Sequence, residues 1–357
     1  MTIALLISAV ALFCFYPETG LFSQEGQDDM QKVAVNDILG NITEYGDVWG
    51  ATNAGAPPFE DPYRRGWLGY LYDPAGHWTI YDGEVNGMGG DDIVQITEYG
   101  DAWVSVRNET LYETPTRWGW LGFRYEESET QYGHYPLIGD VDGDGDDDLI
   151  QVTEYTDAWT ALANETMYDN PTRWGWIGFR FQRPMAGENG EIPLACDVNG
   201  DGLTDLVQIT RYTDAWVALS NGSGYDDPTR WGWLGFSYDP QGGYLPMCGD
   251  VTGDGKDDLL QVTPYGDLWV APADDMFFGS VTQWTVGRIY YHEAYGLYPI
   301  VADVNSDGID DVIQITIDGD PIVNFSNGSG FEPPESWGRM SFFFDRFEGY
   351  LPLYLDY

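Results

Sequence analysis

A segment of about 54 residues recurs along this chain and restricts it to a repeat architecture. The run DVNGDGLTDLVQIT, which begins at Asp197, has counterparts beginning at Asp140, Asp250 and Asp303, and a degraded copy beginning at Glu84. A repeat of this length is one supersecondary unit, which buries its apolar face only by stacking on its neighbours. The chain is therefore expected to form a ring or an array of similar units.

Each unit contains four short stretches of strand-like composition. The first carries a proline at matching positions and is followed by an acidic, glycine-rich loop; the prolines are Pro136, Pro193, Pro246, Pro299 and Pro352. A second apolar strand, such as Leu206–Ile209, comes next, and two more strands follow near 212–221 and 230–236. Four antiparallel strands in about 50 residues are typical of a propeller blade, so we predict an all-β propeller.

The two ends of the chain predict how the ring closes. Residues 349–356 resemble the start of a unit at 243–250, and residues 36–43 resemble the second strand at 91–97. The ends should complete one blade between them, which removes free sheet edges. We predict six blades within a single domain at 28–357, with seven as the alternative; the units lie near 79–125, 135–181, 192–238, 244–291 and 297–344, and the closing blade comes from 33–72 and 350–357.

Four of the acidic loops place oxygen-bearing side chains at positions 1, 3, 5 and 9, with glycine at position 6. A tight loop of this kind folds around one hard cation, and Ca²⁺ prefers six to eight oxygen ligands. An ordinary turn would not need the carboxylate at position 9. We predict four calcium sites, with these ligands: Asp140, Asp142, Asp144, Asp148; Asp197, Asn199, Asp201, Asp205; Asp250, Thr252, Asp254, Asp258; Asp303, Asn305, Asp307, Asp311.

The degraded loop at 84–92 has Met88 where an oxygen ligand is needed. In the closing blade the loop is split between Asp356 and Asp37. We expect no full calcium site in either place.

The loops, the Asp-Leu-Val-Gln strand that follows them and the stretch at 216–224 resemble FG-GAP (VCBS-type) repeats, as found in integrin α-subunit propellers and calcium-binding propeller lectins. The resemblance covers essentially residues 33–357. It implies an extracellular propeller that is stabilised by calcium. Such propellers usually have seven blades, and the six units of this chain differ from that number. Propellers serve adhesion, lectin and enzyme roles alike, so the resemblance does not determine function.

A second repeated motif, Pro-Thr-Arg-Trp-Gly-Trp, places arginine beside tryptophan at one position of several units. One interpretation is packing, with the tryptophan between blades and the arginine paired to an acid of the neighbouring blade. The other is a set of sugar pockets, in which an indole packs on a pyranose and arginine binds its hydroxyls. The candidate ligand-binding residues are Arg64, Trp67, Arg117, Trp118, Arg173, Trp174, Arg230 and Trp231. The tryptophan of the repeated Tyr-x-Asp-Ala-Trp motif is expected in the core.

Four sequons fall at one repeat-equivalent turn and are candidate glycosylation sites: Asn108, Asn164, Asn221 and Asn327. The alternative is a hairpin turn without a glycan. Asn41 lies in a predicted strand and should be less accessible. Cys196 and Cys248 occupy nearly matching places in successive units, where two buried free thiols are favoured over a disulfide.

The chain carries 59 acidic and 15 basic residues, a formal net charge of −44, which disfavours nucleic acid as a partner. An apolar run at 3–16 has the length of a signal peptide, and 1–27 is interpreted as a secretion signal or an apolar N-terminal segment. No integral membrane span is expected elsewhere.

We therefore predict a secreted calcium-binding propeller that recognises extracellular glycans or cell-surface and matrix proteins. One alternative is a structural subunit that polymerises with itself into a filament, surface layer or matrix. A second alternative is the accessory propeller of a secreted hydrolase or lyase. No catalytic motif is present: the three histidines, His77, His134 and His292, occupy unrelated positions, so we predict no enzyme activity.

Overall fold

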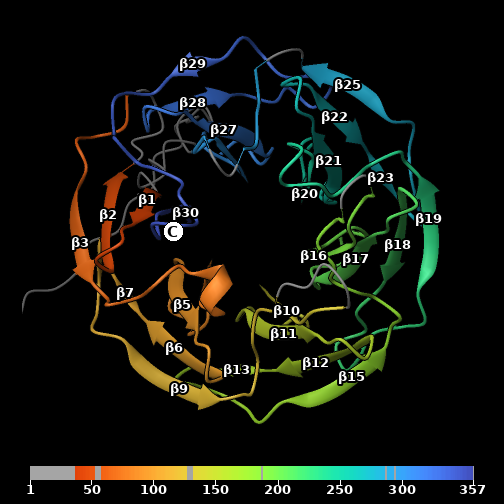
Figure 1. Cartoon of the computed structure of the whole chain (residues 1–357), viewed down its shortest axis with the longest axis horizontal. Coiled ribbons are helices and arrows are strands. Elements are labelled where there is room, and N and C mark those ends of the chain that lie inside the picture. Colours follow the sequence, from red (N-terminus) through yellow and green to blue (C-terminus); the bar gives the residue numbers. More distant parts are fainter. Residues whose placement is uncertain are drawn as a thin grey trace, which may run out of the picture. The chain divides into compact units, whose positions relative to one another are not determined.

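The computed structural model describes residues 37–52, 58–126, 132–185, 188–285, 288–292 and 295–356. Within the compact unit of residues 35–357, six four-stranded antiparallel sheets are arranged in a ring around a central axis (Figure 1). This confirms the six-bladed all-β propeller. The predicted signal or N-terminal segment, and with it the polymerising alternative, lies outside the described residues.

The blades are numbered here in ring order, with strands given from the axis outward. Blade 1 contains β30 (Leu351–Leu355), β1 (Ile38–Ile42), β2 (Asp47–Thr52) and β3 (Tyr63–Trp67). Blade 2 contains β4 (Thr79–Gly83), β5 (Asp92–Ile96), β6 (Asp101–Ser105) and β9 (Thr116–Trp120). Blade 3 contains β10 (Tyr135–Gly139), β11 (Asp148–Val152), β12 (Asp157–Ala161) and β15 (Thr172–Trp176).

Blade 4 contains β16 (Ile192–Cys196), β17 (Asp205–Ile209), β18 (Asp214–Ala218) and β19 (Thr229–Trp233). Blade 5 contains β20 (Leu245–Gly249), β21 (Asp258–Val262), β22 (Leu268–Ala271) and β25 (Thr282–Thr285). Blade 6 contains β26 (Tyr298–Ala302), β27 (Asp311–Ile315), β28 (Pro321–Asn324) and β29 (Glu335–Ser336).

Smaller elements connect the third and fourth strands of three blades. They are two-stranded hairpins, formed by β7 (Arg107–Asn108) with β8 (Leu111–Tyr112), β13 (Ala163–Asn164) with β14 (Met167–Tyr168), and β23 (Ala273–Asp274) with β24 (Phe277–Phe278). A 3₁₀ helix, η1 (Pro74–Gly76), precedes β4. No described helix is long and apolar enough to cross a membrane.

The ends of the described chain close the ring in the predicted way. β1 pairs with both β2 and β30, and Ile38 lies opposite Leu355. Residues more than 300 positions apart thus share one sheet, and β1 is paired along both of its edges.

The core lies between the blades, because each second strand is buried on both faces. In β17 all five residues are buried, and Leu206, Val207 and Ile209 are fully enclosed. A strand covered on both faces has a continuous apolar run in place of alternation. This accounts for the Leu-Val-Gln-Ile type of sequence, except for its glutamine.

The glutamine in this run joins consecutive blades. Gln208 accepts a hydrogen bond from the backbone N–H of Arg180 (2.5 Å), and Gln261 accepts one from that of Ser237 (2.5 Å). In blade 1 the equivalent Asn41 donates to the carbonyl of Phe343 (2.8 Å). These amide side chains are buried, so each bond gives a buried polar group a partner in the preceding blade.

A second set of contacts joins the acidic loops of consecutive blades. The backbone N–H of Asp257 donates to the carbonyl of Asp197 (2.8 Å), and the N–H of Asp197 donates to the Asp257 carboxylate (2.8 Å). Asp310 and Asp250 form the same reciprocal pair. The aspartate at position 8 of these loops therefore links two blades by hydrogen bonds. This role differs from metal binding, which is predicted for the aspartate at position 9.

Cys196 of β16 and Cys248 of β20 form a disulfide between neighbouring inner strands, with Cα atoms 6.2 Å apart. The expectation of two free thiols was wrong. The inner strands of consecutive blades contact one another, which brings the matching positions of successive units within bonding reach.

The inner strands surround a cavity of about 280 Å³ at the axis. Its wall is rich in tyrosine and also includes Asp82, Arg183 and Arg346. At the five positions equivalent to Asp82, the other inner strands have Ile138, Ala195, Cys248, Val301 and Tyr354. Blade 2 alone therefore contributes a carboxylate to the axis from this position.

Candidate functional site: acidic loops and inter-blade grooves

The four predicted calcium loops connect the first and second strands of blades 3 to 6. In blade 3 the carboxylates of Asp140, Asp142 and Asp144 converge, with one oxygen of each within 4.8 Å of the others. Asp140 accepts hydrogen bonds from the N–H groups of Gly143 (2.7 Å) and Gly145 (3.0 Å). Both glycines have positive φ, which lets the loop wrap around its first aspartate.

The aspartate at position 9 begins the second strand and is buried. Asp205 accepts a hydrogen bond from the N–H of Ser220 (2.7 Å), and its other oxygen has no hydrogen-bond partner among the described residues. In the same way Asp311 accepts a hydrogen bond from the N–H of Ser326, and its other oxygen has no partner among the described residues. In the same loop, the side-chain oxygen of Asn305 at position 3 is also buried and has no partner among the described residues. Burial raises the pKa of both carboxyls to about 8. Buried oxygens without donors fit a cation-binding loop, because a carboxylate needs a compensating charge away from water.

The degraded loop in blade 2 is organised differently. Asp92 is the position-9 residue of this loop, and the side-chain amide of Asn86 donates a hydrogen bond to its Oδ2. The corresponding Oδ2 atoms of Asp205 and Asp311 have no partner among the described residues. Beside this loop the guanidinium of Arg107, which is buried, donates to the carbonyl of Asp356 (2.5 Å). A fixed positive charge thus lies between the degraded loop and the split loop of blade 1. Sequence reasoning missed Arg107, although blades 3 to 6 have alanine or serine at this position.

The Arg-Trp motif divides between core and surface. Trp118, Trp174 and Trp231 are buried and pack on an aromatic residue of the next blade, as Trp118 does on Tyr168 with ring centroids 5.7 Å apart. The equivalent position in blade 1 is Arg65, and Trp67 matches the exposed tryptophans Trp120, Trp176 and Trp233. The four arginines form ion pairs with an aspartate of their own blade, in place of the neighbouring blade that we expected; the pairs are Arg64–Asp47, Arg117–Asp101, Arg173–Asp157 and Arg230–Asp214.

The tryptophan of the Tyr-x-Asp-Ala-Trp motif lies on the blade surface in blades 1, 3 and 4, so the expectation of a core residue was wrong there. Trp103 and Trp269, in blades 2 and 5, are half-buried and pack against core residues. Trp216 is 37% exposed, and Trp49 and Trp159 are similar. The indole N–H of Trp216 donates a hydrogen bond to the carboxylate of Asp214 (3.1 Å). A β-bulge between Ala215 and Trp216 alters the pairing at this point of the strand.

These surface tryptophans line grooves between consecutive blades. The Trp78 groove, between blades 1 and 2, has a volume of about 430 Å³ and includes Trp67, Trp78, Tyr99 and Trp103. Trp78 and Tyr99 meet edge to face at 6.4 Å. Its polar wall is formed by Gln95, Thr97 and Asp101.

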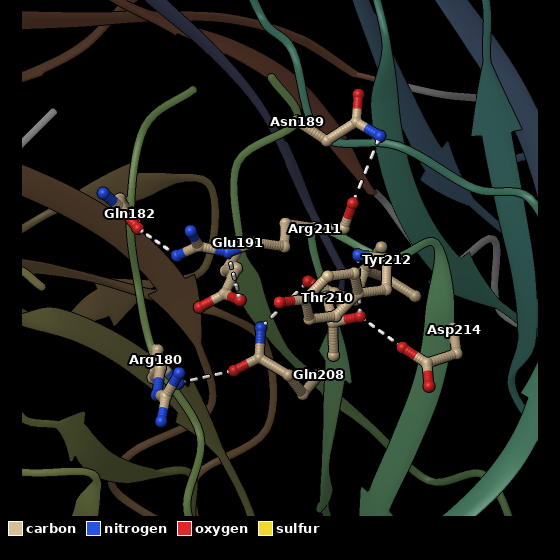
Figure 2. A network of polar contacts seen from close by, with 10 residues as sticks. Arg180, Gln182, Asn189, Glu191, Gln208, Thr210, Arg211, Tyr212 and Asp214 are labelled. Carbon is tan, nitrogen blue, oxygen red and sulfur yellow. Dashed lines mark hydrogen bonds and ion pairs between the residues drawn. The ribbon is translucent and has the colours of Figure 1, made fainter. Parts of the chain in front are cut away.

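The Arg180 groove lies between blades 3 and 4 and has a volume of about 500 Å³. It repeats five positions of the Trp78 groove, with Gln208, Thr210, Tyr212, Asp214 and Trp216 in place of Gln95, Thr97, Tyr99, Asp101 and Trp103. The hydroxyl of Thr210 donates to Asp214, which fixes the carboxylate at the groove wall (Figure 2). Arg180 and Glu191 also line this groove.

The four candidate sequons lie on exposed turns after the third strands. Asn221 and Asn327 each accept hydrogen bonds from the serine two residues later, which is the geometry of an Asx turn. Asn41 is buried, as expected from its place in a strand.

No family model matches this chain, and no curated protein matches it in sequence. Among solved structures, a lectin of Agrocybe aegerita, described as recognising non-reducing terminal N-acetylglucosamine, matches with a TM-score of 0.57 and 15% identity, over 91% of this chain and 98% of the lectin. AofleA of Arthrobotrys oligospora matches with a TM-score of 0.46 and 7% identity, over 90% of this chain and 89% of that chain. The likeness to the Agrocybe lectin supports the propeller fold.

Proposed function

We propose that this protein binds carbohydrate through the grooves between its blades and acts without catalysis. The observation that carries the proposal is the repetition of one surface arrangement at two blade junctions. Each groove sets an exposed tryptophan and tyrosine beside a fixed carboxylate, a threonine and a glutamine. Indole and phenol rings pack on the apolar face of a sugar, while the polar groups hydrogen-bond to its hydroxyls.

The fold favours the same proposal, because the Agrocybe protein with a similar fold is a lectin. Repetition also suits glycans, since several weak sites on one rigid ring bind a multivalent surface with much higher avidity. Trp49, Trp159 and Trp269 occupy the equivalent position at three further junctions.

A glycan array tests this proposal, followed by calorimetric titration of the best oligosaccharide. Trp103→Ala together with Trp216→Ala should abolish or greatly weaken binding, because both indoles line grooves. Phe277→Ala is the matched control, since Phe277 is an exposed aromatic residue of β24 that lies outside both grooves. Failure of the folded protein to bind any glycan, or equal loss in the control, would refute the proposal.

We also propose that the four acidic loops bind Ca²⁺, and that the protein works outside the cell. The converging oxygens and the unpartnered buried carboxylate atoms support the metal. The Cys196–Cys248 disulfide supports an oxidising compartment. Bound calcium would neutralise the loops and brace consecutive blades, without entering any reaction.

Thermal unfolding with and without EDTA tests the calcium proposal. Because Ca²⁺ binds only the folded loops, the melting temperature should rise with calcium concentration and fall in EDTA. Magnesium at equal concentration is the control, because it fits such flexible loops poorly. A melting temperature that does not respond to calcium would contradict the proposal.

A further inference from the structure

The Trp78 and Arg180 grooves share a constant wall and differ at three neighbouring positions. At the Trp78 groove these positions hold Leu71, Trp78 and Glu98, and at the Arg180 groove they hold Arg180, Glu191 and Arg211. Trp78, Arg180 and Glu191 line their grooves, whereas Leu71, Glu98 and Arg211 are sequence neighbours of lining residues. Where the Trp78 groove has an apolar residue, an indole and a glutamate, the Arg180 groove has an arginine, a carboxylate and a second arginine. The two grooves therefore offer the same stacking surface with different charge.

Hydrogen bonds hold two of the charged groups, Glu191 and Arg211, together, and an aromatic ring positions the third, Arg180. Arg211 donates through Nε to Glu191 (2.9 Å) and through Nη2 to Gln182 (2.5 Å), and Asn189 donates to the Arg211 carbonyl (3.4 Å) (Figure 2). The guanidinium of Arg180 lies over the ring of Tyr132, 4.5 Å from its centroid. The side chains are thus positioned before any ligand arrives.

Two polar atoms of this groove are left without partners. Glu191 is only 4% exposed, yet its Oε2 accepts no hydrogen bond from any described residue. Nε of Arg180 donates none to any described residue. Both atoms are enclosed, so a ligand in this groove would satisfy them only after a small movement of the two side chains.

The charge balance of the groove selects the kind of ligand. Of its two carboxylates, Asp214 already has Arg230 nearby (3.9 Å) and accepts bonds from Thr210 and Trp216. Glu191 is paired with Arg211, which leaves the charge of Arg180 uncompensated among the groove residues. In a chain with a net charge of −44, a groove with a spare arginine is suited to an anionic group.

We infer that the Arg180 groove binds a sugar residue that carries an anionic group, a carboxylate or a sulfate, whereas the Trp78 groove binds a neutral sugar. Arg180 would contact the anionic group, and Trp216 would pack on the sugar ring. This inference rests on the proposed carbohydrate binding and names the ligand class of one groove.

The test is calorimetric titration of the whole protein with three matched oligosaccharides: a galactose oligomer, its galacturonic acid counterpart and a sulfated galactose oligomer. The acidic sugars should bind in addition to the neutral one, and their affinity should fall as salt is raised. Comparing the uronate with the sulfated sugar identifies which anionic group is preferred.

Two substitutions convert the groove toward the Trp78 type, Arg180→Leu and Arg211→Glu. Each should weaken the binding of acidic sugar by about tenfold or more and leave neutral-sugar affinity unchanged. Arg211→Gln repeats the second test without reversing the charge, in case Arg211→Glu impairs folding. Arg288→Leu is the matched control, because it removes an equal charge from an exposed side chain outside both grooves.

The outcomes separate this inference from the proposed function. If neutral sugars bind and acidic sugars do not, or if Arg180→Leu leaves acidic-sugar binding intact, the inference is wrong and carbohydrate binding stands. An equal loss in Arg288→Leu would show a general charge effect, which also overturns the inference. Absence of binding to all three sugars and to the array would overturn both.

Discussion

At the scale of single residues, the acidic loops separate two roles for aspartate. Position 8 joins neighbouring blades through backbone groups, as Asp257 does with Asp197. Position 9 is buried at the start of a strand, and in blades 4 and 6 Asp205 and Asp311 keep an oxygen without a donor among the described residues. In blades 3 and 5 both oxygens of Asp148 and Asp258 accept backbone hydrogen bonds. The unpartnered buried oxygens favour a cation at position 9.

Substitution of a single loop residue should remove a single metal site. For Asp201→Ala we expect calcium stoichiometry, measured by calorimetric titration, to fall from about four to about three, because position 5 supplies one of the few side-chain ligands. Asp227→Ala, an exposed acidic residue outside the loops, should leave the stoichiometry unchanged. Equal stoichiometry in Asp201→Ala and the parent would exclude this loop as a site.

Arg107 should act as a permanent cation in the sector that lacks calcium ligands. Replacing it with methionine removes the donors to the carbonyls of Glu109 and Asp356 while retaining much of the side-chain volume. We expect a loss of about 1–3 kcal/mol in the free energy of unfolding, which added calcium does not restore. Urea unfolding measures this loss.

Arg230→Met is the control for this substitution, because Arg230 belongs to an exposed ion pair that should contribute at most about 1 kcal/mol. An effect of Arg107→Met no larger than that of Arg230→Met would contradict the assigned role.

The sequence predicted some of these residues and not others, for a physical reason. A calcium loop places its ligands within nine consecutive residues, so its pattern is visible locally. Trp118 and Trp120 lie two residues apart in one strand, and alternation alone predicts similar burial. Their exposed fractions are 5% and 65%, because Tyr168 of the next blade covers only the first.

At the scale of elements, the second strand of each blade combines core packing with a link to the preceding blade. Its glutamine is an interruption in an apolar run, and from sequence alone it has no evident partner. In blades 3 to 6 the partner is a backbone N–H that lies 24 to 28 residues earlier in the chain, and in blade 2 it is the carbonyl of Leu71. Only the assembled ring brings the two groups together. The same reason explains why the disulfide was not anticipated.

Loss of one such glutamine should destabilise a blade junction. Gln261→Met preserves the side-chain length but leaves the N–H of Ser237 buried without an acceptor. We expect the free energy of unfolding to fall by about 1–3 kcal/mol. Gln283→Met, in the exposed strand β25, should change it by less than about 0.5 kcal/mol. Similar effects of the two substitutions in urea unfolding would argue against the junction.

At the scale of the whole molecule, the ring brings six inner strands to one axis, so that their inward-facing side chains surround one cavity. Five of them have no ionisable carboxylate at the position of Asp82. Asp82 lines the axial cavity, and burial raises its pKa to about 6 from an ordinary value of 3.8. Its charged form is therefore disfavoured in the folded ring and not in the unfolded chain.

This gives a pH dependence of defined sign. Because the folded state holds the Asp82 proton more tightly than the unfolded state, stability contributed by this group is present below about pH 4 and is lost as pH rises through about 6. Asp82→Asn removes the free-energy cost of holding an ionised carboxylate at the axis. At pH 7.5 the variant should therefore be more stable than the parent by about 1–3 kcal/mol. At pH 4, where Asp82 is protonated in the folded protein, this difference in stability should become small. Urea unfolding at both pH values in saturating calcium measures the difference, with the exposed Asp227→Asn as the control. An advantage of equal size at both pH values would mean that packing, and not the charge at the axis, causes it.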